Sequence, residues 1–293
     1  MSIAGGALKL DLGAGECLIP NTSGTCITPT DRVSEHVRDY LRSIPEGQMY
    51  ANMDMASMCK ALEEILNVDT EAGIWEHPQF RKFVGAQLAD HVLNERYKQP
   101  GPADSTALLD NNNIDDTLGQ WSKYSGKLFG KKFLHLPFQM IDFRKTRSEL
   151  SYLDLEDLIN KKYDSFGVVL NTDVSSGKGK HWFCLYGDLK HMGTKEDPYR
   201  LEYFNSSGNP PLDEVAMWLE QSCHDLLKKG IHCEIVRSVP RRLQNSQTEC
   251  GMWSLLYIRS RLEGKPPSWF YTCKTNDRDM IAYRKKVFRS VSQ

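Results

Sequence analysis

The sequence predicts an α+β fold, with a central mixed sheet flanked by helices and a small helical domain ahead of it. Short strand-like segments alternate with amphipathic helices beyond residue 130, whereas the first hundred residues show only helical periodicity. The stretch Gln99-Pro100-Gly101-Pro102 cannot continue a helix. The predicted domains are therefore residues 1–99, a helical arm, and residues 100–293, the core domain.

Three segments of the predicted arm carry apolar residues at helical spacing, namely residues 32–41, 53–66 and 78–97. Residues 1–30 are rich in Gly, Ser, Thr and Pro and are expected to be irregular. In the third segment the apolar side is formed by Phe80, Phe83, Val84, Leu88, His91 and Val92. One continuous helix is predicted there.

The core domain is predicted to begin with a helix over residues 117–128, behind capping residues at 113–116. Helix periodicity returns over 212–229, where Gly230 is placed as the C-terminal cap, and again from Cys250 to about Gly264. The predicted strands are residues 138–143, 166–171, 181–186, 199–204 and 232–239. Strands and helices mixed in this way give an α+β domain.

Composition bounds the possible functions. With 293 residues and 40% hydrophobic content, the chain can bury one large core or a main domain with a smaller appendage. A net charge of −1 argues against nucleic acid as the main partner. No run of eighteen apolar residues and no secretory signal occurs, so no membrane span is expected.

The chain contains eight scattered cysteines. Without a secretory signal, this pattern predicts reduced thiols in an intracellular, reducing compartment rather than a disulfide framework. Two adjacent pairs, Cys223-His224 and His232-Cys233, raise the possibility of zinc, but neighbours on a helix or a strand point to different sides. No metal and no cofactor is expected.

The segment most indicative of chemistry is Cys250-Gly251, which opens an apolar predicted helix. A cysteine at a helix N-terminus feels the positive end of the helix dipole, which favours its thiolate. Gly251 allows another part of the chain to approach closely. A buried structural thiol is the alternative for Cys250.

A base for such a nucleophile is available in His181, which opens a predicted strand after a flexible loop. Asn205 ends the next strand, where its side-chain oxygen could accept the ring N–H of His181 and fix its tautomer. The alternative for Asn205 is a turn residue. Histidine, asparagine and cysteine in this order are typical of a cysteine protease site.

Gln244 lies six residues before Cys250 and could reach back over it. Its amide N–H, together with the backbone N–H of Cys250, could hold the oxyanion of a tetrahedral intermediate. Gln247 is nearer to Cys250, and spacing alone does not choose between the two glutamines.

These motifs resemble the SUMO-specific (ubiquitin-like) protease family. The matching segments are Gly179-Lys-His181-Trp182, Glu202-Tyr-Phe-Asn205-Ser, Gln244, and Ser246-Gln-Thr-Glu-Cys250-Gly251. Within the family, the chain is most similar to the polyprotein-processing cysteine proteases of African swine fever virus and related large DNA viruses. Asn205 and Glu249, where most cellular members have Asp, favour this viral branch.

The resemblance implies a SUMO-protease-like core in which Cys250 is the nucleophile, His181 the base, Asn205 its orienter and Gln244 the oxyanion-hole residue. It also implies a cysteine endopeptidase that cuts after Gly-Gly in viral structural polyproteins during virion maturation, in the host cytoplasm and the virion core. Trp182, beside the base, is a candidate wall for a narrow glycine tunnel. A SUMO or ubiquitin-like deconjugase and a non-catalytic ubiquitin-like or scaffold-binding module are the alternatives.

Overall fold

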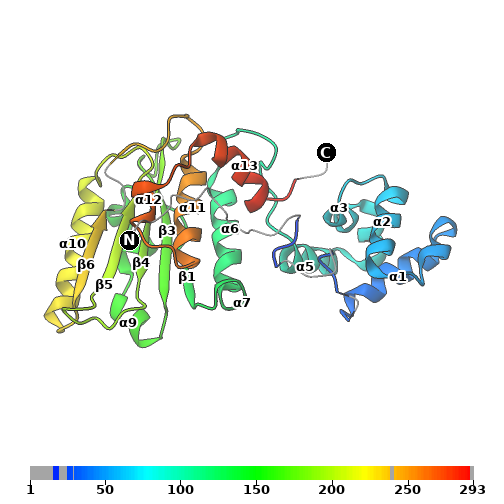
Figure 1. Ribbon diagram of the computed structural model, residues 1–293, viewed down its shortest axis with the longest axis horizontal. Helices are drawn as coiled ribbons and strands as arrows, with labels where there is room; N and C mark the ends of the chain where they lie inside the picture. The colour runs from blue at the N-terminus through cyan, green and yellow to red at the C-terminus, as the bar shows by residue number, and fades with distance from the viewer. Residues whose placement is uncertain (1–15, 20–24, 29, 238–240, 291–293) are drawn as a thin grey trace. The chain divides into compact units, whose positions relative to one another are not determined.

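The computed structural model describes residues 16–19, 25–28, 30–237 and 241–290 (Figure 1). Contacts within the chain divide it into two compact units. Residues 106–281 form one unit, and the described residues up to 105 form the other together with residues 282–290. The C-terminal segment joins the helical unit through a bridge between Pro100 and Arg289, in which the Arg289 N–H donates to the Gln99 carbonyl at 3.1 Å.

The helical unit is built from short helices around its own apolar core. Its elements are α1 (Val33–Ser43), η1 (Pro45–Tyr50), α2 (Met55–Leu66), α3 (Glu71–Glu76), α4 (Pro78–Val84) and α5 (Ala86–Arg96). Asp54 and Thr70 cap α2 and α3 by accepting the backbone N–H of the third residue along. The fully buried Trp75 packs edge-on against Phe80, with ring centroids 5.0 Å apart.

The prediction of one helix over residues 78–97 is wrong. Gly85 has a φ of 90° and separates α4 from α5. Because no right-handed helix passes through that conformation, the buried face changes at this point. Phe80 is buried before the break and Val92 after it, while Phe83 is exposed.

The larger unit contains a six-stranded mixed sheet within its described residues (Figure 1). The strands are β1 (Phe133–His135), β2 (Gln139–Met140), β3 (Ser165–Asn171), β4 (Trp182–Asp188), β5 (Tyr199–Phe204) and β6 (Cys233–Arg237). Their order is β1-β3-β4-β5-β6, and β2 also pairs with β3. The central β3, β4 and β5 are antiparallel, whereas β1 and β2 join β3 in parallel and β6 joins β5 in parallel.

The sheet confirms the predicted fold class, but its edge strands differ from the predicted ones. The predicted strand over residues 138–143 is reduced to β2, because Phe143 begins helix α8 (Phe143–Thr146). Strand β1 was not predicted, and its three residues become a strand only through pairing with β3. The last predicted strand extends to residue 239, beyond the described residues that form β6.

Helices cover both faces of the sheet. Those that pack against its strands are α6 (Asn111–Lys123), α10 (Asp213–Lys228) and α11 (Cys250–Leu262). The other helices are α7 (Ser125–Phe129), α8, η2 (Glu149–Tyr152), α9 (Leu155–Asn160), α12 (Trp269–Thr272) and α13 (Asp277–Val287), whose last residues belong to the helical unit. Helix α6 begins six residues earlier than predicted. Asp110 forms a capping box with Asn113, in which each side chain accepts the other's backbone N–H.

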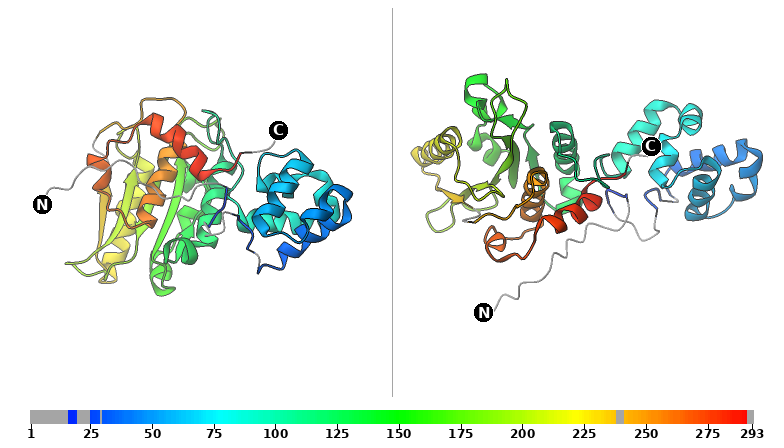
Figure 2. Two further views of the ribbon diagram at one scale, coloured as in Figure 1. Left: turned by 45° about the vertical axis from the view of Figure 1, so that its right-hand side comes forward. Right: turned by 90° about the horizontal axis from the view of Figure 1, so that it is seen from above.

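Strand alternation sorts the sheet residues between α10 and α11, which lie on different faces (Figure 2). Phe166 of β3 packs edge-on against Trp218 of α10. On the other face Phe204 of β5 stacks on Tyr257 of α11, with centroids 4.4 Å apart. All thirteen residues of α11 are buried, and the helix packs on β4.

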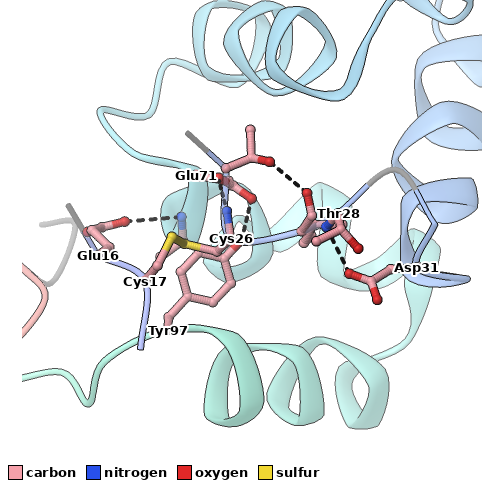
Figure 3. Close-up of a disulfide and its surroundings, with 10 residues drawn as sticks. Glu16, Cys17, Cys26, Thr28, Asp31, Glu71 and Tyr97 are labelled. Carbon is pink, nitrogen blue, oxygen red and sulfur yellow. Dashed lines mark hydrogen bonds between the residues drawn. A yellow bond between two sulfur atoms is a disulfide. The ribbon is translucent and has the colours of Figure 1, made fainter. Parts of the chain in front are cut away.

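The prediction that all cysteines are reduced thiols is wrong for four of them. Cys17 and Cys26 form a disulfide in the helical unit, shown in Figure 3, and Cys223 and Cys233 form another in the larger unit. The Cα atoms of the two pairs are 5.1 and 5.2 Å apart, a separation that suits a disulfide. Helix α10 packs on β6, which brings the second pair together although ten residues separate it in sequence.

The Cys17–Cys26 disulfide lies among hydrogen bonds that tie the start of the chain to α3 (Figure 3). The backbone N–H of Cys26 donates to Glu71 at 3.0 Å, and the hydroxyl of Tyr97 donates to the same carboxylate at 3.0 Å. Burial raises the pKa of Glu71. The disulfide therefore fixes a segment that is already hydrogen-bonded to Glu71 of α3, whose carboxylate Tyr97 also holds.

Among the described residues, no helix combines the length and apolar character needed to cross a membrane.

Candidate active site

Cys250 is the first residue of α11 and is only 3% exposed. Its sulfur faces the backbone N–H groups of Trp182 and Gly251, which favour its thiolate. The Trp182 N–H belongs to the peptide that joins His181 to Trp182. The structure therefore places the His181-Trp182 peptide directly against the sulfur of Cys250.

The expected thiolate at Cys250 is not supported. Burial raises the pKa of the Cys250 thiol, and the backbone N–H groups at the helix N-terminus offset this only in part. The carboxylate of Glu249 also raises it. The helix N-terminus suggested by the sequence is present, but desolvation of the sulfur has the larger effect on the pKa of Cys250.

Gly251 lies in tight contact with the chain that crosses the start of α11. A Cβ at this position would lie 3.1 Å from the side chain of Leu109. The Leu109 carbonyl in turn accepts the indole N–H of Trp182 at 3.0 Å. Leu109 thus links the start of α11 to Trp182, which is buried and packs edge-on against Phe138.

His181 and Asn205 are brought together by the sheet register. Cys184 pairs with Phe204, so the next step of the register sets Asn205 opposite Phe183, and His181 lies two residues along on the same face. The distance from His181 Nε2 to Asn205 Oδ1 is 2.8 Å.

The surroundings of Asn205 fix which end of its amide faces His181. Asn205 Oδ1 also accepts the backbone N–H of Ser207 at 3.0 Å and its hydroxyl at 2.8 Å. Asn205 Nδ2 donates to the Tyr203 hydroxyl at 3.0 Å. Because a backbone N–H can only donate, Oδ1 must be the atom on the His181 side.

Tyr203 completes this arrangement. Its hydroxyl donates toward the carbonyls of Asn209 and Pro210, at 3.1 and 3.2 Å. Burial raises the pKa of Tyr203 to about 12, so the hydroxyl stays protonated. Its oxygen is therefore available to accept the Asn205 Nδ2–H. Asn205 does lie in a turn, as its alternative reading proposed, and it also contacts the histidine.

Of the two candidate glutamines, the structure buries Gln244 and leaves Gln247 exposed. Gln244 Oε1 accepts the hydroxyl of Ser206 at 2.7 Å, and Gln244 Nε2 donates to the Ser246 carbonyl at 2.8 Å. An amide nitrogen carries two hydrogens, so a second N–H remains for another acceptor.

The loop that carries Gln244 is held by Asp277 at the start of α13. One carboxylate oxygen of Asp277 accepts the backbone N–H groups of Asn245 and Ser246, both at 2.7 Å. The other accepts the indole N–H of Trp253, in α11, at 3.1 Å. Asp277 therefore fixes this loop to the helix that begins at Cys250.

The loop before His181 is closed by Asn171 and Asp173. Asn171 Oδ1 accepts the backbone N–H of Asp173 at 3.0 Å and of Lys180 at 2.9 Å. The Asp173 carboxylate accepts the Gly179 N–H and the ammonium of Lys180. The hydrogen bond from Lys180 lowers the pKa of Asp173. His181 thus follows a loop with internal bonds at both ends.

A cavity of about 420 Å³ opens beside Cys250. Leu108, Leu109, Phe138, Met140 and Trp182 supply its apolar lining, while Asn171, Lys178 and Lys180 are among its polar lining. A cleft beside a cysteine with both apolar and polar lining can take the side chains and the backbone of an extended peptide. The described residues contain no group of three or more side chains suited to a metal ion.

No family model matches the sequence. A protein of African swine fever virus (Pretoriuskop isolate), named SUMO-1 cysteine protease, is 36% identical over 243 residues. The match covers 78% of this chain and 85% of the relative. The chain belongs to this family of viral cysteine proteases. A protein from the Badajoz strain of the same virus, named cysteine protease, matches over the same length at 36% identity.

Membership of the viral cysteine protease family is supported by the fold. A crystal structure of the African swine fever virus protease aligns with a TM-score of 0.74 and 29% identity. The alignment covers 94% of this chain and 96% of that one. The resemblance inferred from the motifs is confirmed, and the chain is a cysteine peptidase.

Several supporting residues of this viral cysteine protease were not identified from sequence. Leu109, Ser206 and Asp277 lie far along the chain from the groups they contact. Of these three, only Ser206 could have been found from the sequence, because it directly follows Asn205 within a motif that matches the family.

Proposed function

We propose that this cysteine peptidase cleaves after Gly-Gly in viral structural polyproteins during virion maturation, in the host cytoplasm and the virion core. The observation that carries the proposal is the contact of the Cys250 sulfur with the His181-Trp182 peptide, with His181 held by Asn205. Nucleophile, base and orienter thereby form one connected site.

The tautomer of His181 determines which ring nitrogen can take a proton from Cys250. Asn205 Oδ1 accepts from Nε2, so neutral His181 carries its proton on Nε2 and a lone pair on Nδ1. Nδ1 removes the proton from the Cys250 thiol as the sulfur attacks the scissile carbonyl carbon. Because burial raises the pKa of the Cys250 thiol, this transfer accompanies attack instead of preceding it.

The oxyanion then forms on the carbonyl oxygen. The backbone N–H of Cys250 lies in the first turn of α11, where no helical carbonyl is available to it. It donates to the oxyanion together with the second N–H of Gln244 Nε2. His181 then gives its Nδ1 proton to the departing amine, which leaves a thioester on Cys250. Water, deprotonated by His181, hydrolyses the thioester and restores the thiol.

Selection of glycine is supported by the crowding around the nucleophile. Leu109 packs against Gly251, and its carbonyl holds the indole of Trp182. Trp182 lines the cavity beside Cys250, as the sequence suggested for the tunnel wall. Glycines would pass most easily between Leu109 and Trp182, because they bring no side chain to these buried groups.

The test compares hydrolysis of two matched peptides, one containing Gly-Gly-Xaa and one containing Ala-Ala-Xaa. Cleavage after the second glycine is expected, with a loss of about 10²-fold or more for the alanine peptide. Cys250→Ala is expected to remove activity while circular dichroism shows an unchanged fold. Equal cleavage of the two peptides would exclude the glycine selectivity, and an active Cys250→Ala would exclude this nucleophile.

A second candidate is suggested by the African swine fever virus relative, which is named SUMO-1 cysteine protease. A deconjugase recognises a folded ubiquitin-like domain as well as the glycines. Faster cleavage of a SUMO conjugate than of a Gly-Gly-Xaa peptide and of the co-encoded polyproteins would favour this function. The proposed polyprotease instead produces new N-termini after paired glycines in the polyproteins.

A further inference from the structure

We propose that Ser206 is a positioning residue, whose hydroxyl fixes the Gln244 amide so that its Nε2–H is presented to the oxyanion. The proposal rests on the function proposed above for Gln244. It adds to the site a residue that touches neither the substrate nor Cys250.

The contact that carries the proposal is the hydrogen bond from Ser206 Oγ to Gln244 Oε1, at 2.7 Å between two buried side chains. Gln244 Nε2 donates to the Ser246 carbonyl at 2.8 Å. The hydroxyl thus takes the oxygen end of the amide, and the carbonyl takes one hydrogen of the nitrogen end. The second hydrogen of Nε2 is left with a fixed direction.

Without the hydroxyl, Gln244 Oε1 would lose this partner in a buried position. A buried acceptor without a partner is costly, so the amide would rotate toward other partners. A rotation that exchanges the two ends would set Oε1 against the Ser246 carbonyl, where two acceptors repel. Ser206 therefore stabilises the one orientation that leaves an N–H for the oxyanion.

The backbone of Ser206 serves the same loop independently. Its carbonyl accepts the N–H groups of Leu243 and Gln244 at 2.8 and 3.0 Å. These two bonds do not need the side chain, so Ser206→Ala removes the hydroxyl contact alone. The path of the loop before Cys250 should survive this substitution.

Ser206 directly follows Asn205, so one dipeptide supports both the base and the proposed oxyanion donor. The two effects are separable, because Asn205 acts on His181 and Ser206 acts on Gln244. Alkylation of Cys250 by iodoacetamide forms no oxyanion and depends on sulfur reactivity alone. The alkylation rate therefore changes if Cys250 or His181 is disturbed, but it does not depend on the oxyanion contact of Gln244.

The experiment uses the full chain and compares wild type, Ser206→Ala, Gln244→Ala and the double variant on a Gly-Gly-Xaa peptide. Gln244→Ala is expected to lower kcat about 10²-fold, as loss of an oxyanion donor does. Ser206→Ala is expected to lower kcat about 10-fold with KM unchanged, since Gln244 is retained but less well held. In the double variant, loss of Ser206 should add nothing to loss of Gln244.

A matched control is Ser260→Ala, which removes a buried hydroxyl in α11 with no hydrogen-bond partner among the described residues. It should retain wild-type kcat, and Ser206→Ala should retain the wild-type alkylation rate at Cys250. A wild-type kcat in Ser206→Ala would overturn the proposal. So would a further loss when Ser206→Ala is added to Gln244→Ala.

A separate measurement keeps this inference distinct from the proposed function. In ¹⁵N-labelled protein, the Gln244 side-chain NH₂ signals, assigned with Gln244→Glu, should be protected from solvent exchange in wild type and lose protection in Ser206→Ala. If the wild type cleaves no Gly-Gly-Xaa peptide, the proposed function fails while this measurement still tests the positioning. Unchanged protection in Ser206→Ala would refute the positioning whatever the activity.

Discussion

His181 Nε2 lies 2.8 Å from Asn205 Oδ1, and the backbone N–H of Ser207 donates to the same oxygen. Since that N–H admits only an acceptor, the backbone of a turn determines the orientation of the Asn205 amide and through it the tautomer of His181. In the neutral ring this leaves the lone pair on Nδ1, the atom proposed above to accept the Cys250 proton.

The first prediction concerns Asn205. Asn205→Asp should retain most activity, because a carboxylate oxygen still accepts from His181 and Ser207 and the Tyr203 hydroxyl can donate to the other oxygen. Asn205→Ala should lower kcat about 10²-fold, since the tautomer and ring orientation are no longer held. Steady-state kinetics on a Gly-Gly-Xaa peptide measures both. Equal losses in the two variants would contradict the role assigned to the acceptor oxygen.

Two glycines with nearly the same backbone offer a matched pair. Gly208 and Gly230 have φ values of 76° and 77°, but only Gly208 is crowded, with a Cβ position 2.6 Å from the backbone of Arg241. Gly230→Ala should cost about 1–2 kcal/mol from the left-handed conformation alone. Gly208→Ala should cost more and should also lower kcat, because it displaces the chain just before Gln244.

Urea unfolding and peptide hydrolysis of both glycine variants measure these effects. Gly230→Ala serves as the control for backbone strain, because nothing lies within 4 Å of its Cβ position. If Gly208→Ala lost no more activity than Gly230→Ala, the approach of the Arg241 backbone would have no bearing on the site.

The disulfide of the helical unit gives a third prediction. Replacing both Cys17 and Cys26 by serine should destabilise that unit by about 2–3 kcal/mol, the value expected for a closed loop of this length. Hydrogen exchange of the α3 and α5 amides should accelerate, while hydrolysis of a short peptide should be unchanged. Dithiothreitol should reproduce the acceleration in wild type and have no effect on the double serine variant. Wild-type exchange that is indifferent to the reductant would show that this disulfide contributes nothing to stability.

The fourth prediction concerns pH. Burial raises the pKa of Cys250 above its ordinary value of 9.0, so the folded protein favours the protonated thiol. Alkylation by iodoacetamide without substrate should therefore increase with pH, with a midpoint above 9.0, and Cys250→Ala gives the background from other thiols. Stability contributed by the neutral thiol is complete below the unfolded-state pKa and is lost as pH rises through the folded-state pKa.

A midpoint well below neutrality would instead indicate a resting thiolate and imidazolium pair. In that case the nucleophile would already be ionised, and no proton transfer from Cys250 to His181 would accompany the attack.

The sequence by itself determined the order of His181, Asn205, Gln244 and Cys250, the helix that begins at Cys250 and the three central strands. These features depend on residues that are close together in the sequence, through the spacing of apolar residues and the types of neighbouring residues. The tertiary structure decided the edges of the sheet, because β1 and β2 are too short to form without β3 beside them. It also paired four cysteines, joined Arg289 to Pro100 and raised the pKa of Cys250 by burial. Ser206 and Asp277 became part of the site in the same way, because each acts on a group 31 or more residues away. Local periodicity carries no information about such distant contacts, and only the folded chain brings them together.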